Sequence, residues 1–101
     1  MIVTVFRNRL RADNQAEYFD AVKRMSDLAR TMPGYVSHKT FTAEDGERVT
    51  IVEFADEASQ KAWAVHAQHM AAKSRGREAF YSEYSIQVCS VVRDSRWQKP
   101  A

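Results

Sequence analysis

Four residues of this chain have the side chains and spacing expected of a small-molecule site. Trp63, His66 and His69 lie within one ten-residue stretch, KAWAVHAQHM, and Asn8 interrupts the apolar run MIVTVFRNRL. Imidazoles exchange protons near neutral pH, an indole offers a wide apolar face, and a carboxamide both donates and accepts hydrogen bonds. If the stretch is a helix facing the strand of Asn8, these groups predict a pocket for a small molecule, with oxygen chemistry as one use.

Each of these residues also has a purely structural interpretation. An amide in an apolar strand can bond a neighbouring backbone group or lie at the solvated strand end, although burial without any partner costs about 1–3 kcal/mol. Tryptophan is more often a core residue, and single histidines are more often exposed or already hydrogen bonded. Two histidines three residues apart can also bind a metal, with His38 as the one further histidine.

Composition limits the classes of function. The 101 residues are 45% hydrophobic and 28% charged, as expected of one globular domain. The net charge is only +2, and the basic residues are spread along the chain instead of forming a nucleic-acid-binding stripe. The single cysteine, Cys89, excludes an internal disulfide and fits a reducing compartment. With no signal peptide and no apolar run of about 20 residues, we expect a cytoplasmic protein that binds neither nucleic acid nor membrane.

Hydrophobic periodicity predicts four strands and two helices. The strands are expected over residues 2–10, 35–42, 48–54 and about 81–92, and the helices over about 15–32 and 57–73. Asn14 and Glu17 are spaced as a capping box for the first helix, which Pro33 ends. Asp56 is the expected N-cap of the second helix, and Gly76 lies just beyond its end.

The order β-α-β-β-α-β is that of a ferredoxin-like α+β fold with both helices on one face of an antiparallel sheet. The other face would be solvated if every second strand residue were polar. Both sides of the first and fourth predicted strands are instead apolar at their centres, with Ile2 and Phe6 opposed to Val3 and Val5 in the first strand. Monomers rarely expose an apolar patch of several hundred Å². We therefore expect a two-fold homodimer formed through the sheet face.

The same alternation places a pocket between the second helix and the sheet. Asn8 shares a strand side with Phe6, the side assigned to the helices. Trp63, His66 and Met70 are spaced by three and four residues and are expected to form one stripe, with Trp63 facing the sheet. The spacing leaves open which of His66 and His69 faces the pocket. No glycine-rich phosphate loop and no nucleophile arrangement is legible in the sequence.

Four segments of the chain resemble the antibiotic biosynthesis monooxygenase domain family. They are MPGYVSHKTF, AEDGERVTIVEF, KAWAVHAQHM and FYSEYSIQVC, and the resemblance extends from Met1 to about Val92. Its most specific parts are Met-Pro-Gly before the second strand and Trp-x-x-His-x-x-His on the second helix. The resemblance implies a dimeric α+β barrel, with a family domain over residues 1–92. The remaining residues, 93–101, are expected to form a C-terminal tail that Trp97 anchors.

The resemblance further implies cofactor-independent oxidation of a small phenol- or quinol-type substrate by O₂, without metal or flavin. Asn8 would hydrogen-bond the phenolate or a peroxy intermediate, Trp63 would pack on the ring, and His66 or His69 would move a proton. The expected substrate contacts are Phe6, Met70, Arg77, Tyr81 and Tyr84. The alternative is a small-molecule-binding protein of the same fold without turnover.

A haem-degrading branch of this superfamily also has an asparagine on the first strand and a tryptophan on the second helix. Its axial histidine follows the tryptophan by about three helical turns, where this chain has Ala71-Ala72-Lys73. That departure counts against haem binding. His69 could replace the missing ligand only if the helix or the haem were displaced.

Overall fold

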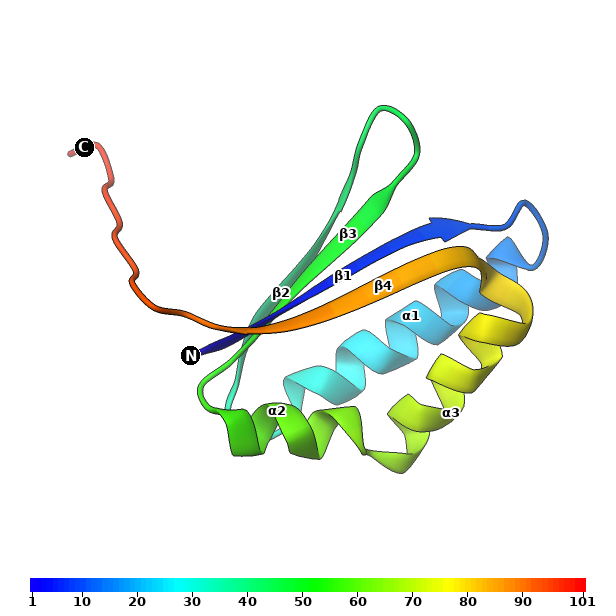
Figure 1. The fold of residues 1–101 in the computed structure, drawn as a ribbon, viewed down its shortest axis with the longest axis horizontal. Coiled ribbons are helices and arrows are strands. Elements are labelled where there is room, and N and C mark those ends of the chain that lie inside the picture. Colours follow the sequence, from blue (N-terminus) through cyan, green and yellow to red (C-terminus); the bar gives the residue numbers. More distant parts are fainter.

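A computed structural model describes all 101 residues as a four-stranded antiparallel sheet with a layer of helices on one face (Figure 1). The elements in chain order are β1 (Ile2–Leu10), α1 (Gln15–Arg30), β2 (Tyr35–Thr42), β3 (Arg48–Phe54), α2 (Glu57–Ala64), α3 (Ala67–Arg75), the π-helical turn η1 (Gly76–Phe80) and β4 (Tyr81–Ser90). The strand order is β2-β3-β1-β4, and every neighbouring pair is antiparallel. The predicted ferredoxin-like α+β fold class is confirmed.

Strand register decides which side chains face the helices. Residues directly opposite one another in an antiparallel pair lie on the same face of the sheet. Phe6 of β1 is opposite Thr50 of β3 and Ile86 of β4, so these side chains lie on the helix side. Val5 is opposite Ile51 and Gln87, which lie on the outer face. β1 is therefore a central strand of the sheet surface that faces the helices.

The core beneath the helices consists of two clusters. One contains Tyr18, Ala79 and Phe80, and the other contains Ala29, Phe54 and Trp63. Phe54 is completely buried. Members of both clusters line one cavity.

The prediction of one helix over residues 57–73 is wrong, because the helix is interrupted between Ala64 and Ala67. His66 has φ −58° and ψ 132°, and its Nδ1 accepts a hydrogen bond from the backbone N–H of Gln68 at 3.2 Å. A side chain that satisfies a free N–H in this way begins a new helix. The expected stripe of Trp63, His66 and Met70 is therefore not formed, and α3 changes direction relative to α2 (Figure 1).

The caps of the helices differ in part from the expectation. Asp56 caps α2 as predicted, since its Oδ1 accepts from the Ser59 N–H at 2.8 Å. The capping box on α1 is wrong. Asn14 has φ 60° and its side chain donates to the Ala79 carbonyl at 3.2 Å, while Glu17 pairs with Arg75 at 2.6 Å. Both contacts attach the start of α1 to the C-terminal end of the helical layer.

Gly76 directly follows the last residue of α3, as predicted, but the chain continues in a helical conformation through η1. Its φ of −58° is an ordinary helical value that needs no glycine. The reason for glycine is contact: a Cβ at this position would lie 2.6 Å from Cε2 of Tyr81. The missing side chain lets the Tyr81 ring lie against the helix and face the cavity.

The C-terminal segment leaves the body of the protein after β4 (Figure 1). β4 ends at Ser90, and Val92 is 93% exposed. The expectation that Trp97 anchors the tail is wrong for the single chain, since its side chain is 83% exposed.

Candidate functional site

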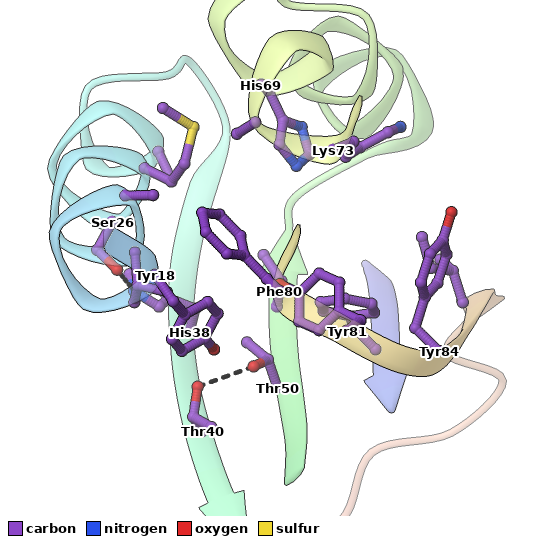
Figure 2. Close-up of a pocket in the computed structure, with 18 of the residues that line it drawn as sticks. Tyr18, Ser26, His38, Thr40, Thr50, His69, Lys73, Phe80, Tyr81 and Tyr84 are labelled. Carbon is purple, nitrogen blue, oxygen red and sulfur yellow. Dashed lines mark hydrogen bonds between the residues drawn. The ribbon is translucent and has the colours of Figure 1, made fainter. Parts of the chain in front are cut away.

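A mostly apolar cavity of about 170 Å³ lies between the sheet and the helices and opens to solvent (Figure 2). An apolar cavity of roughly 150 Å³ holds a benzene-sized ligand, so the space matches a small aromatic molecule. The lining residues that carry polar groups or large rings are Phe6, Tyr18, Ser26, His38, Thr40, Thr50, Trp63, His69, Lys73, Phe80, Tyr81 and Tyr84.

Trp63 and His69 contact each other in the wall of this cavity. Their rings are stacked, with centroids 4.1 Å apart and planes inclined by 13°. His69 Nδ1 lies 3.0 Å from the backbone carbonyl oxygen of Trp63. Because a carbonyl can only accept, Nδ1 carries the hydrogen of the neutral ring and Nε2 keeps its lone pair. The two residues are six positions apart in the sequence. They meet because the helix is interrupted at His66, where α3 begins.

The environment of His69 keeps its imidazole neutral. Burial lowers the pKa of His69 below its usual value, and the positive charge of Lys73 lowers it further, against the opposing effect of the Trp63 carbonyl. Lys73 also lines the cavity and forms no ion pair with a carboxylate within the chain. This end of the cavity therefore combines a proton acceptor with an uncompensated cation.

A wall of aromatic rings borders the cavity on the β1 and β4 side. Phe6, Tyr81 and Tyr84 contact one another edge to face, with centroids 5.5–5.8 Å apart. Burial raises the pKa of both Tyr81 and Tyr18 above the usual value, so both phenols stay protonated at neutral pH. Arg77 reaches this wall only at its rim, where Nη1 donates to the Tyr84 hydroxyl at 3.2 Å.

A second polar group lines the cavity from α1 and β2, and sequence reasoning missed it. His38 lies between two hydroxyls, with Nδ1 2.7 Å from Tyr35 Oη and Nε2 3.0 Å from Ser26 Oγ. The hydroxyls of Thr40 and Thr50 pair at 2.8 Å beside it (Figure 2). Strand alternation could have placed His38 and Thr40 on one face, but nothing in the spacing joins Ser26 to them.

Asn8 lies outside the cavity, although it shares the face of Phe6. Its side chain is almost fully buried at 2% exposure, and Oδ1 has no hydrogen-bond partner. Directly opposite on β3, the buried Nε of Arg48 also lacks a partner. Asn8 instead borders a separate polar hollow, together with Arg7, Glu47, Glu83, Tyr84 and Ser85. A buried acceptor and a buried donor that both lack partners each cost stability.

The predicted site residues are thus only partly brought together. Phe6, Trp63, His69, Tyr81 and Tyr84 line the cavity. His66 is half-buried at the start of α3 but does not line the cavity, and Met70 is 51% exposed. Between His66 and His69, the fold directs His69 to the cavity, which the sequence left open.

Two further features bear on other functions. No three histidine, cysteine, aspartate or glutamate side chains converge in a group that could hold a metal ion. No helix has the length and apolar character to span a bilayer.

Comparison with known proteins identifies the family of this fold. The sequence profile described as antibiotic biosynthesis monooxygenase matches residues 1–75. The chain belongs to the antibiotic biosynthesis monooxygenase family. The resemblance inferred from the sequence is confirmed, and the matched range includes β1, α2 and α3, which carry Asn8, Trp63 and His69.

The relatives of this antibiotic biosynthesis monooxygenase domain cover nearly its whole length. It is 27% identical over 95 residues to YqjZ of Bacillus subtilis, covering 94% of this chain and 83% of that protein. Its fold is similar to that of Rv0793 from Mycobacterium tuberculosis, with a TM-score of 0.81, 14% identity and coverage of 94% and 98% of the two chains. It is also similar to SnoaB, a cofactor-independent oxygenase from Streptomyces nogalater, with a TM-score of 0.76, 15% identity and coverage of 92% and 94%.

Proposed function

We propose that this protein is a cofactor-independent monooxygenase that oxidises a small phenol- or quinol-type molecule with O₂ in the cavity beneath the helices. The observation that carries the proposal is His69, whose unprotonated Nε2 is available in an apolar, ring-sized cavity while its Nδ1 is fixed on the Trp63 carbonyl. Its membership in a family whose fold SnoaB shares supports the same activity class.

The residues present could perform the first step of such a reaction. His69 Nε2 accepts the phenolic proton, and the ammonium group of Lys73 stabilises the resulting anion at close range. Tyr18, as a protonated phenol, donates a hydrogen bond to a substrate oxygen. Phe6, Trp63 and Tyr84 hold the ring between apolar surfaces.

The substrate then supplies the electrons. The anion delocalises its charge onto a ring carbon, and that carbon adds O₂ to form a hydroperoxide. Loss of water leaves a carbonyl, so a CH₂ group and O₂ become C=O and H₂O. Asn8 is the group proposed to hydrogen-bond the oxygen species, provided that the Phe6, Tyr81 and Tyr84 side chains move enough to connect its hollow with the cavity.

Oxygen consumption tests this activity. A panel of phenols, quinols and anthrone-type compounds is incubated with the protein in an oxygen electrode, in metal-free buffer. Oxygen uptake that requires both protein and substrate, with product mass increased by one oxygen and decreased by two hydrogens, supports the proposal. Ligand-dependent quenching of tryptophan fluorescence without oxygen uptake would instead favour the binding protein without turnover.

Haem was the other ligand class raised by the family resemblance. His69 offers an imidazole nitrogen that could ligate iron, but the cavity of about 170 Å³ is small beside the roughly 300–1,000 Å³ that drug-sized ligands occupy. Lys73 belongs to the stretch that corresponds in sequence to the axial histidine of the haem-degrading branch, and it lines the cavity. The residues present therefore do not fit haem in this conformation. A one-per-chain Soret transition on hemin titration that His69→Ala abolishes would contradict this conclusion.

A two-fold homodimer through the outer sheet face also belongs to the proposal. Val3, Val5, Val49, Ile51 and Phe41 lie on that face by strand register, and Phe41 is 50% exposed. Charged pairs such as Arg7–Glu47 surround this apolar centre. An apolar centre with a charged rim is the usual anatomy of an interface between subunits.

A further inference from the structure

We propose that Ser26, His38 and Tyr35 form a nucleophile–base–orienting group that transfers acyl groups from small aryl esters bound in the cavity. This activity is separate from oxygenation and does not depend on it. The chemical class of the substrate is an ester of a small phenol with a short carboxylic acid.

The distances are those of a nucleophile activated by a general base. Ser26 Oγ lies 3.0 Å from His38 Nε2, within the range of about 2.6–3.2 Å that defines such a pair. Tyr35 Oη lies 2.7 Å from Nδ1 on the other side of the same ring. With the imidazole hydrogen on Nδ1 and donated to Tyr35, Nε2 accepts the hydrogen of Ser26. Tyr35 thereby fixes the tautomer of His38, which is the role of the third residue in a catalytic triad.

The surroundings of the pair favour this protonation state. Burial lowers the pKa of His38 below its usual value, and the positive charge of Arg30 lowers it further. No carboxylate bonds to the ring, since both nitrogens are occupied by hydroxyls. His38 is therefore neutral at pH 7 and able to accept a proton.

The pair also has access to a substrate. Ser26 and His38 both line the cavity, whose remaining walls are mostly apolar and match an aryl ring. The hydroxyls of Thr40 and Thr50 line the same cavity and share one hydrogen bond. One O–H forms that bond, so the other O–H is free to donate to an oxyanion. Thr40 lies two residues from His38 on the same face of β2, about 7 Å along the strand.

The covalent steps balance without an added co-reactant. Ser26 Oγ attacks the ester carbonyl carbon while its proton passes to His38 Nε2. The bond from that carbon to the phenolic oxygen breaks, and the oxygen takes the proton from His38 and leaves as a phenol. Water then attacks the acyl-serine by the same route, which releases the carboxylic acid and restores Ser26.

The test uses the intact protein and 4-nitrophenyl acetate as the probe. We expect a burst of 4-nitrophenolate and a mass increase of one acetyl group, which peptide mapping assigns to Ser26. Ser26→Ala should abolish the adduct, and His38→Gln should slow acylation roughly 100-fold, the usual contribution of a general base. Ser26→Cys should restore acylation as a thioester, which a merely structural serine would not do.

Ser37→Ala is the matched control, because Ser37 Oγ bonds Glu53 at 2.7 Å and has no imidazole beside it. Circular dichroism checks that each variant is folded. An acetyl group found on Cys89, a lysine or another histidine instead of Ser26 would overturn the proposal. So would an acylation rate that His38→Gln leaves unchanged in a folded protein, since Ser26 and His38 would then only attach α1 to β2.

Discussion

The imidazole of His69 lies flat against the indole of Trp63 and bonds the backbone carbonyl of the same residue at 3.0 Å. One residue thus fixes both the plane and the tautomer of the other. The arrangement requires a helix that stops after Trp63 and restarts before His69. The break at Val65 and His66 is therefore part of the candidate site and not only a feature of the fold.

Variants of His69 and Trp63 should distinguish proton transfer by His69 from the packing of its ring on Trp63. We expect His69→Ala to lower kcat for oxygen uptake by about 100-fold, because a positioned general base contributes at least that much. Trp63→Phe should retain more activity than His69→Ala, since the backbone carbonyl that fixes His69 remains. Steady-state oxygen uptake measures both variants. Equal activity of His69→Ala and the unchanged protein would remove His69 from the mechanism.

The buried histidines make stability depend on pH. Burial lowers the pKa of His38 and of His69 below the unfolded value of 6.5, so the unfolded chain binds more protons than the native state below that pH. Stability is therefore fully present above 6.5 and falls as the pH drops from there toward the native pKa values. Urea unfolding at several pH values checks this, and the double variant His38→Gln/His69→Gln should show a smaller loss. An unchanged pH dependence in that variant would contradict the assignment.

Gly76 should tolerate no side chain. Gly76→Ala would place Cβ 2.6 Å from the Tyr81 ring, so we expect a loss of about 1–3 kcal/mol of stability, typical of overpacking. Gly46→Ala is the matched control: its Cβ meets nothing within 4 Å, but φ is +91°, so only the backbone cost of roughly 1–2 kcal/mol applies. The two variants differ in a second measurement. Only Gly76→Ala should move Tyr81 and thereby weaken ligand binding in the cavity.

We expect Asn8 to lower the stability of the fold while contributing to turnover. Asn8→Val removes a buried oxygen without a partner and introduces a side chain suited to a strand. We expect the free energy of unfolding of the variant to equal that of the original protein or to exceed it by up to about 1 kcal/mol. We expect oxygenase turnover to fall. Urea unfolding and oxygen uptake test the two halves. A large loss of stability would show that Asn8 has a structural partner, such as a tightly held water.

The outer sheet face should form the dimer interface. Ile51→Lys places a charge at the apolar centre of that face, so we expect the variant to sediment as a monomer in analytical ultracentrifugation. Val65→Lys is the control, since Val65 is 67% exposed at the break between α2 and α3. A monomeric original protein at micromolar concentration would contradict the interface itself.

Local patterns in the sequence determined most of the fold. The strands over 2–10, 35–42 and 48–54 begin and end at the predicted residues, because alternation and turn residues such as Gly46, with φ 91°, act over a few positions. The Asp56 cap is equally local. The family could also be recognised from short motifs, since Trp63, His66 and His69 stand at characteristic spacing.

Only the tertiary structure decided which side chains meet. A continuous helix through residue 73 was consistent with the sequence, but the His66 cap divides it and directs His69 toward the cavity. The Ser26–His38 contact joins α1 to β2 over twelve residues, and no periodicity encodes it. Gly76 is required by the ring of Tyr81 and not by its own φ. Secondary structure follows from local backbone preferences, whereas the composition of a cavity follows from packing between elements distant in the chain.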